Sequence, residues 1–317
     1  MENIYQITVP TPYQIGDVHL YVIVNDSITL IDAGVKTEKA WAAFKNQLAS
    51  LHLTVEDIDQ VILTHHHPDH VGLLHYLPSV PVYGHPHIEP WLTYKKSTAE
   101  TYNSYFENLF LQLSVPYSYK SQIPRFEGQF KYGAEAKLAG TLSEGASPPL
   151  LKGWKVLHMP GHAGNHIALY HEEKEELIAG DVLLDKIVSN PLIEPPFFEG
   201  EHEKPQLEYN NSLQRLLSLK VQKLYPGHGK VIENVSELTR ERMIKQRKKA
   251  ESLLPFLEEG KTGFEICQHL FPHAYEKQLA LTLSMTLAQL HYLEEVGYIQ
   301  KVEKQGKWFF RKSEVKV

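Results

Sequence analysis

Four histidines and one aspartate fall within six consecutive positions, from His65 to His70, in the stretch VILTHHHPDHVG. The residues before them, Val61 to Leu63, are apolar and mostly β-branched, as in a buried strand. Imidazole and carboxylate groups are the nitrogen and oxygen ligands that zinc and related divalent metals take. Side chains at a strand end are held by a rigid element and still remain free to meet an ion. The spacing therefore indicates a metal site rather than a polar loop.

Three further segments place a metal-type ligand beside glycine, directly after an apolar run. They are HMPGHAGNH with His162, IAGDVLL with Asp181, and LYPGHGK with His228. Glycine beside a ligand lets the backbone turn sharply, so that the side chain can face inward. Four separate strand ends thus each offer a ligand, which is hard to obtain by chance.

The surrounding sequence predicts the elements that position these ligands. Apolar, β-branched runs indicate strands within residues 4–35, at 60–64 and 81–85, and again within 154–184. Helical periodicity covers residues 37–51, with Thr37 as N-cap, and further helices are expected over 70–77 and 206–219. Residues 86–150 are instead rich in aromatic residues, with helical spacing at 97–113, and are predicted to form a helical cap insertion whose rings mostly pack in its own core.

The chain is predicted to divide into a catalytic domain, residues 1–235, and a C-terminal domain, residues 236–317. From residue 236 the pattern indicates a long polar helix, two more helices and a hairpin that turns at Gly306, which is the outline of a winged helix. This C-terminal region carries 14 basic and 11 acidic residues, which leaves 18 basic and 27 acidic residues for residues 1–235. A catalytic domain with this excess of acidic residues has no evident basic surface for binding the phosphate backbone of a nucleic acid.

Composition narrows the class of protein. The 317 residues are 42% hydrophobic, enough for one large or two smaller globular domains, and the net charge of −6 does not suit a general polyanion binder. A single cysteine, Cys267, excludes an internal disulfide framework and a cysteine-based zinc cluster. No stretch reaches the length of a membrane span without charge, so we expect no membrane partner and a cytoplasmic location.

Taken as a set, THHHPDH, PGH, GD and PGHG resemble the metallo-β-lactamase superfamily of hydrolases over roughly residues 5–235. The resemblance implies an αββα sandwich with two metal ions at one edge. It also implies three groups of ligands: His65, His67 and His162 for the first metal, Asp69, His70 and His228 for the second, and Asp181 as the bridge between them. His66 occupies the variable position of the motif and is interpreted as a non-ligand.

The implied cofactors are two divalent ions, with zinc expected and iron or manganese admitted by such mixed ligands. Two such ions about 3.5–4 Å apart share a hydroxide that is nucleophilic at neutral pH, so no serine or cysteine nucleophile is required. Asp69 is the predicted catalytic residue, because a ligating carboxylate keeps a second oxygen for orienting the hydroxide or accepting a proton. Asp32 lies between a strand and a helix, which favours a helix cap or a turn, while the resemblance implies that it also lies near the site behind the ligands. His166 has either a structural role or one supporting the ligands.

Three functions remain open from the sequence. The metal set resembles that of the glyoxalase II branch, which favours hydrolysis of a small thioester or ester such as a hydroxyacylglutathione. The basic helix and the C-terminal outline resemble a β-lactamase-like group that includes a mitochondrial endoribonuclease, so a phosphodiesterase acting on single-stranded RNA is the alternative. A non-enzymatic nucleic-acid-binding regulator ranks last, since it leaves the ligand set unexplained. The sequence leaves a homodimer open and assigns no substrate-binding residue.

Overall fold

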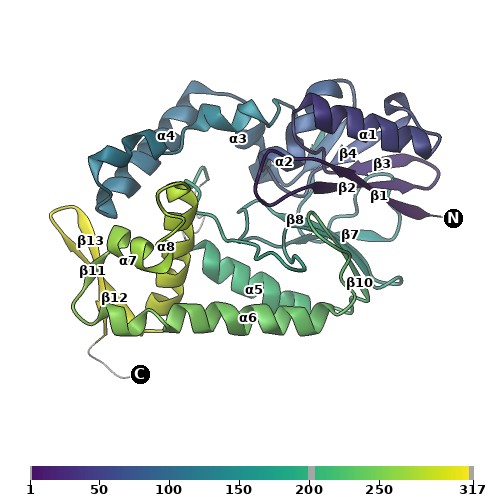
Figure 1. Ribbon diagram of the computed structural model, residues 1–317. Coiled ribbons are helices and arrows are strands. Elements are labelled where there is room, and N and C mark those ends of the chain that lie inside the picture. The colour runs from purple at the N-terminus through teal and green to yellow at the C-terminus, as the bar shows by residue number, and fades with distance from the viewer. Residues whose placement is uncertain (1, 199–203, 314–317) are drawn as a thin grey trace.

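Two β-sheets that face each other form the centre of the computed structural model, which describes residues 2–198 and 204–313 (Figure 1). The first sheet has the order β1-β2-β3-β4-β5-β6, antiparallel from β1 to β3 and parallel from β3 onward. The second has the order β10-β9-β8-β7. Their strands are β1 (Asn3–Val9), β2 (Val18–Val24), β3 (Ile28–Ile31), β4 (Gln60–Ile62), β5 (Val82–Gly84), β6 (Gly140–Thr141), β7 (Trp154–His158), β8 (Ile167–His171), β9 (Glu176–Gly180) and β10 (Lys223–Pro226).

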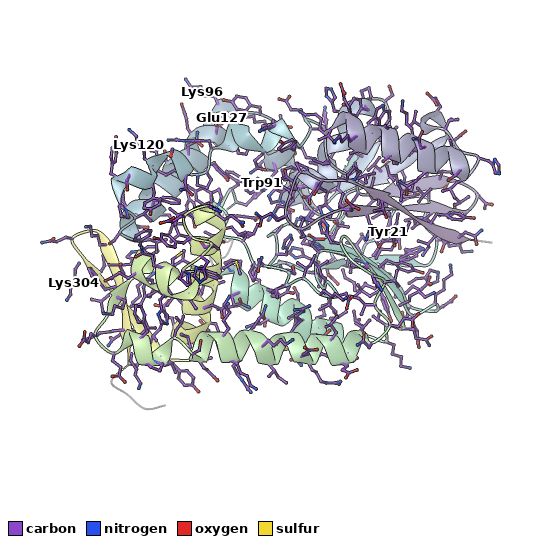
Figure 2. The ribbon with its side chains drawn as sticks, in the orientation of Figure 1. Tyr21, Trp91, Lys96, Lys120, Glu127 and Lys304 are labelled. Carbon is purple, nitrogen blue, oxygen red and sulfur yellow. The ribbon has the colours of Figure 1, made fainter. Side chains whose placement is uncertain are left out.

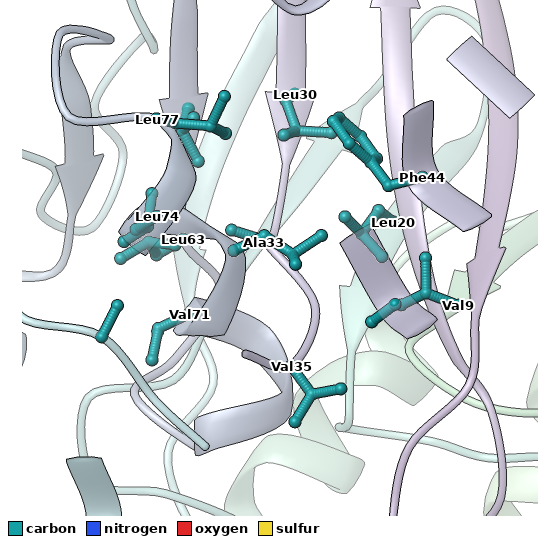
Figure 3. Packing of buried hydrophobic residues seen from close by; sticks show 14 of the residues in the cluster. Val9, Leu20, Leu30, Ala33, Val35, Phe44, Leu63, Val71, Leu74 and Leu77 are labelled. Atoms are coloured by element: carbon teal, nitrogen blue, oxygen red, sulfur yellow. The ribbon is translucent and has the colours of Figure 1, made fainter. Parts of the chain in front are cut away.

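Strand β2 explains why the sheets stack. Successive side chains of a strand point to opposite faces. Leu20 and Val22 belong to the cluster that packs under helix α1 (Glu38–Ser50), as Figure 3 shows for Leu20 and Phe44. Tyr21 and Ile23 belong instead to the cluster between the two sheets. Because both faces of β2 are buried, the first sheet is an inner layer of the fold.

Helix α5 (Pro205–Ser218) covers the outer face of the second sheet. Its Leu213 and Leu216 share a cluster with Leu177 of β9 and Leu224 of β10. The layers are therefore helix, sheet, sheet, helix, and the expected αββα architecture is confirmed. The expected cap of α1 is also present, since Ala40 N donates to the Thr37 hydroxyl at 3.1 Å.

The helix expected over residues 70–77 is replaced by two shorter elements. Helix α2 (Pro68–Val71) passes into a 3-10 helix, Gly72–Tyr76. The backbone N–H of Gly72 donates to Gly34 O at 2.6 Å, and that of Leu73 donates to Ala33 O at 2.5 Å. These bonds to a neighbouring loop take the place of the bonds that would continue an α-helix.

The helical insertion, residues 86–131, contains α3 (Glu89–Leu92), α4 (Lys96–Gln112) and three 3-10 helices. It is shorter than the segment 86–150 expected to be helical. Gly140–Thr141 form β6, which pairs in parallel with β5 and so returns the chain to the first sheet. Figure 1 shows α3 beside the sandwich and α4 farther from it.

The C-terminal elements are α6 (Val235–Glu251), α7 (Gly263–Leu270), α8 (Leu279–Glu295) and a sheet of β11 (Lys261–Thr262), β13 (Lys307–Lys312) and β12 (Ile299–Lys304). Buried rings of the insertion, such as Phe106 and Phe126, share one cluster with Leu290 of α8 and Phe310 of β13. Ring contacts such as those of Tyr102 with Phe106 and Phe126 lie within the insertion, as expected, and the shared cluster extends this core to the C-terminal elements. Among the helices of the described ranges, none combines the length and hydropathy of a membrane span.

Candidate metal centre

Four loops that leave the strands of the sandwich bring the predicted ligands together. The loop after β4 carries His65 to His70, the turn between β7 and β8 carries His162, and Asp181 and His228 follow β9 and β10. All of these ligands are buried except His67, which is partly exposed. The structure gathers them into two groups, in each of which the ligand atoms lie within 4.8 Å of one another: His65, His67 and His162, and Asp69, His70 and His228. These are the two sets that the resemblance implied.

Asp181 lies between the two groups. Its Oδ2 is 3.5 Å from His162 Nε2 of the first group and 3.6 Å from His228 Nε2 of the second. Its Oδ1 is 3.7 Å from His70 Nε2, which also belongs to the second group. A single carboxylate thus faces both groups, which is the position a bridging ligand requires.

Hydrogen bonds at the far side of each imidazole fix which nitrogen faces the site. His70 Nδ1 donates to Asp32 Oδ2 at 2.8 Å, His162 Nδ1 to Asn190 O at 2.9 Å, and His228 Nδ1 to Asp17 O at 2.7 Å. In the neutral imidazole the opposite nitrogen then carries the lone pair. Each of these three rings therefore presents Nε2 to the centre as an acceptor.

A hydrogen bond at Nδ1 also sets the tautomer of His65, and here its partner is a hydroxyl group. The Thr64 hydroxyl donates to Asp32 Oδ2 at 2.8 Å, so its oxygen accepts from His65 Nδ1 at 3.0 Å. The lone pair of His65 is then on Nε2, which lies 2.9 Å from His67 Nδ1. The two nitrogens converge on one point, as two ligands of one ion do.

The chemistry of this donor set fits divalent metal ions. Within the described residues, His70 Nε2, His162 Nε2, His228 Nε2 and Asp181 Oδ1 are buried atoms without a hydrogen-bond partner. Burying such atoms is costly unless a ligand satisfies them. Burial lowers the pKa of His65 well below its ordinary value, which keeps that imidazole neutral. Burial raises the pKa of Asp181, but His228 and His70 outweigh it and hold that pKa well below the usual range.

Asp32 supports the site from behind and does not cap a helix, since Thr37 caps α1. It is buried, with φ of 61°, and its Oδ1 accepts from the Thr64 backbone N–H at 2.7 Å. Its Oδ2 accepts from Thr64 and from His70. One carboxylate thus orients a ligand of each group, His70 directly and His65 through the Thr64 hydroxyl.

We expect Asp32→Asn to lower metal affinity by roughly 10–100-fold, the effect of removing a partner that orients a metal ligand. Asparagine tolerates positive φ, so the backbone can keep its path, but the new amide nitrogen cannot accept from His70 Nδ1. Titration of the metal-free variant with zinc measures the change. The exposed Asp26→Asn serves as control. Unchanged affinity in a folded Asp32→Asn protein would show that the hydrogen bond to His70 has no such role.

His166 contacts the ligand residues without joining either group. Its ring stacks on that of His65 with centroids 4.7 Å apart, and its Nε2 accepts from the Asp181 backbone N–H at 3.0 Å. This hydrogen bond holds the backbone of Asp181 in place where the chain leaves β9. His166 is fully buried, which agrees with a supporting position.

Glu194 is a residue that sequence reasoning missed. Its Oε1 lies 3.5 Å from His66 Nε2 and 3.9 Å from His67 Nε2, and its Oε2 accepts from the Gly164 backbone N–H at 3.0 Å. His66, His67 and Glu194 form a further group of clustered ligand-type atoms. No local motif marks Glu194, which lies in an irregular segment between prolines and reaches the site only through the tertiary fold.

A pocket of about 410 Å³ opens beside His67. The histidine loop forms one side through His66 and His67, and the insertion forms another through Trp91, Tyr102 and Arg125. The ring of Trp91 stacks on that of His66 with centroids 3.8 Å apart. Ile193 and Glu194 complete the lining. The volume lies in the range of about 300–1,000 Å³ that small-molecule sites occupy.

This fold and ligand arrangement define a metal-dependent hydrolase of the metallo-β-lactamase superfamily, to which the chain belongs. The model of that superfamily matches residues 14–228. The chain is 39% identical over 295 residues to the probable metallo-hydrolase YqjP of Bacillus subtilis (strain 168), and the match covers 92% of each chain.

Two further relatives agree with this assignment. The crystal structure of the metallo-beta-lactamase family protein TTHA1429 from Thermus thermophilus superimposes with a TM-score of 0.83, at 28% identity and over 98% of both chains. The beta-lactamase-like protein 2 homolog of Caenorhabditis elegans is 26% identical over 75% of this chain and 66% of its own length. The similarity to YqjP and TTHA1429 includes the C-terminal elements as well as the sandwich.

Proposed function

We propose that the protein hydrolyses a small thioester or ester at a centre of two divalent metal ions. The observation that carries this proposal is the pocket of about 410 Å³, which has the His66–His67 edge of the metal centre as one wall and the aromatic insertion as another. Apolar walls with a few polar groups are typical of small-molecule sites. A pocket of this size holds an acyl group beside the ligands and has no room for folded RNA.

In this proposal His65, His67 and His162 hold one ion, Asp69, His70 and His228 hold the other, and Asp181 contacts both. Zinc is the proposed metal, and iron and manganese suit the same mixed ligands. When bound, such ions polarise a carbonyl oxygen and make water acidic enough to supply a nucleophile near neutral pH. The protein contributes the fixed positions of the ligands, through the bonds at His70, His162 and His228 described above.

Asp69 is proposed to orient the attacking water and to accept its proton. One of its oxygens, Oδ2, lies 3.4 Å from His228 Nε2. Burial raises the pKa of Asp69, but the neighbouring imidazoles of His228 and His70 outweigh burial, so the pKa lies below its ordinary value. The side chain is therefore a carboxylate at neutral pH and can accept hydrogen bonds through both oxygens.

We expect Asp69→Asn to lower kcat by roughly a hundredfold or more, the scale of losing a general base. The amide keeps the volume of the carboxylate but loses its charge and its ability to take a proton. Steady-state kinetics after saturation with metal measures the effect, and elemental analysis of the same sample reports occupancy. Wild-type turnover in a metal-replete variant would refute the role assigned to Asp69.

We expect elemental analysis of the protein saturated with zinc to give two ions per chain. Ions that bind only the folded state stabilise it by RT ln(1 + [L]/Kd), about 2.7 kcal/mol per site at a hundred times Kd. Removing them with a chelator should therefore lower Tm, and adding zinc should restore it. One ion per chain under saturating conditions would contradict the two-ion centre, whereas iron or manganese would correct only the metal.

The C-terminal elements are proposed to form a winged helix that supports the insertion. The order of α7, α8, β12 and β13 supports this assignment, and the cluster shared with Phe106 and Phe126 supports the structural role. The same elements leave the alternative of RNA binding to be tested directly.

The substrate class is tested by assaying the metal-replete protein side by side on S-lactoylglutathione, simple aryl esters and single-stranded RNA. We expect hydrolysis of the thioester or the esters and none of the RNA. Cleavage of RNA with no activity on the acyl compounds would overturn the proposal in favour of a phosphodiesterase. A protein inactive on all three substrates after confirmed metal loading would also contradict it.

A further inference from the structure

The charges that line the pocket beside His67 are divided between its two sides. Glu194 lies at the histidine side, where its Oε1 is 3.5 Å from His66 Nε2. Arg125 lies on the insertion, and among the described residues that line the pocket it is the single lysine or arginine. A ligand in this pocket therefore meets a carboxylate near the metal centre and a guanidinium away from it.

The position of Arg125 relative to the aromatic wall follows from helix α4. Arg125 Nη1 pairs with Glu107 Oε1 at 2.7 Å, and Glu107 lies five residues beyond Tyr102 on that helix. At about 1.5 Å per residue this is roughly 7–8 Å along the helix axis. Tyr102 in turn lies 6.0 Å from Trp91, the ring that stacks on His66. The pocket lining thus includes Trp91 against His66, Tyr102 against Trp91, and Arg125, which pairs with Glu107 farther along the same helix.

A second hollow meets the first at Arg125. It measures about 640 Å³, and its lining contains Arg125 with its partner Glu107 and a further cation, Lys120, among apolar side chains such as Phe110. Figure 2 shows Trp91 at the side of the insertion that faces the sandwich, and Lys120 near the end of the insertion that lies away from the sandwich. Arg125 therefore lines both hollows.

We propose that Arg125 determines substrate specificity by binding an anionic group, carboxylate or phosphate, on the leaving group of the thioester. This inference rests on the proposed function and narrows its substrate to thioesters of an anionic carrier. The guanidinium has five N–H donors in a rigid fork, and carboxylate and phosphate oxygens match that fork. Its ion pair with Glu107 through Nη1 orients the group. Glu194 at the histidine side repels an anion and so favours the orientation with the anionic group at Arg125.

The test compares three thioesters that share one acyl group. Acyl-coenzyme A carries phosphates, S-acylglutathione carries carboxylates, and the N-acetylcysteamine thioester has a neutral leaving group. We expect Arg125→Gln to raise KM about tenfold for an anionic thioester, the scale of one charge-assisted hydrogen bond at a half-exposed site, while KM for the neutral thioester stays within about twofold. Added salt should weaken the wild-type preference for the anionic substrate, because exposed charges are screened.

Lys96→Gln is the matched control, since Lys96 is an exposed cation of the same insertion, paired with Glu100 on α4 and absent from both linings. If Arg125→Gln raises KM for the coenzyme A thioester alone, the recognised anion is phosphate. If it raises KM for the glutathione thioester alone, the recognised anion is carboxylate. Equal effects of Arg125→Gln on the neutral and anionic thioesters, or effects no larger than those of Lys96→Gln, would overturn the inference.

A binding measurement separates this inference from the proposed function. Calorimetric titration of the metal-free protein with free coenzyme A, and separately with reduced glutathione, reports recognition of the leaving group without turnover. We expect at least one of them to bind the wild type and to bind Arg125→Gln about tenfold more weakly. Equal binding to both proteins, or no binding of either compound to the wild type, would overturn the role of Arg125. Inactivity of the wild type on all three thioesters and on the aryl esters would instead overturn the proposed function, whatever the titration shows.

Discussion

Replacing Asp181 with asparagine is expected to remove one or both metal ions and to lower kcat by roughly a thousandfold, at the upper end of the effect of deleting one electrostatic contact in an active site. The reason is the position of its carboxylate, within 3.5–3.7 Å of the Nε2 atoms of His162, His228 and His70. An amide keeps the volume but presents a neutral group with two N–H donors to atoms that themselves bind cations. Elemental analysis and steady-state kinetics on one sample measure both effects.

Asp26→Asn is the control for Asp181→Asn, because Asp26 is an exposed aspartate in the turn between β2 and β3 and changes the net charge equally. The circular dichroism spectrum and Tm of both metal-free variants establish that the fold is retained. A folded Asp181→Asn protein that holds two ions per chain and turns over at the wild-type rate would show that Asp181 is not shared between the two groups.

Gly227→Ala is expected to abolish high-affinity metal binding, although it adds a single methyl group and removes no ligand. A Cβ at this position would lie 2.2 Å from Asp181 Oδ1 and 2.8 Å from His70 Cε1. Both atoms belong to buried side chains held by other bonds, so the clash must displace a ligand or the backbone. Overpacking of this kind also costs about 1–3 kcal/mol of stability. Metal titration and chemical denaturation measure the two effects.

Gly128→Ala provides the comparison for folding and metal content, since a Cβ there meets nothing within 4 Å. We expect it to retain both ions and wild-type stability. If Gly227→Ala bound metal as tightly as Gly128→Ala, the close approach of residue 227 to Asp181 would have no role in shaping the centre.

The residues that gather at the candidate metal centre could be predicted from the sequence because each is marked by a local pattern. A strand end followed by a histidine or aspartate beside glycine or proline is visible in a few residues, as at His162, Asp181 and His228. Strands such as β2 were predictable because a strand buried on both faces is a continuous apolar, β-branched run, whereas the αββα layers were expected from the resemblance of the motif set to the superfamily.

Features that depend on contacts between distant segments could not be predicted, because no local pattern in the sequence marks them. Glu194 comes close to His67 only because an irregular segment crosses the site. The helix expected after His70 gave way to a 3-10 helix because Gly72 bonds to Gly34, 38 positions earlier. The rings of the insertion contact one another, as Tyr102 and Phe126 do, yet their cluster also includes Leu290 of the C-terminal region, and no local pattern in the sequence marks that association. Tertiary contacts of this kind override local periodicity.

The cluster that joins the insertion to the C-terminal helices also constrains how the chain folds as it is synthesised. More than 150 residues separate the end of α4 at Gln112 from the start of α8 at Leu279. At about 5–20 residues per second, translation of that interval takes roughly 8–30 s. Throughout this time the cluster lacks its C-terminal members, such as Leu290 and Phe310, so apolar surface of the insertion that they cover in the folded protein stays exposed to solvent. Chaperone binding and aggregation compete with folding during that interval, so variants that weaken α8 are expected to lower soluble yield.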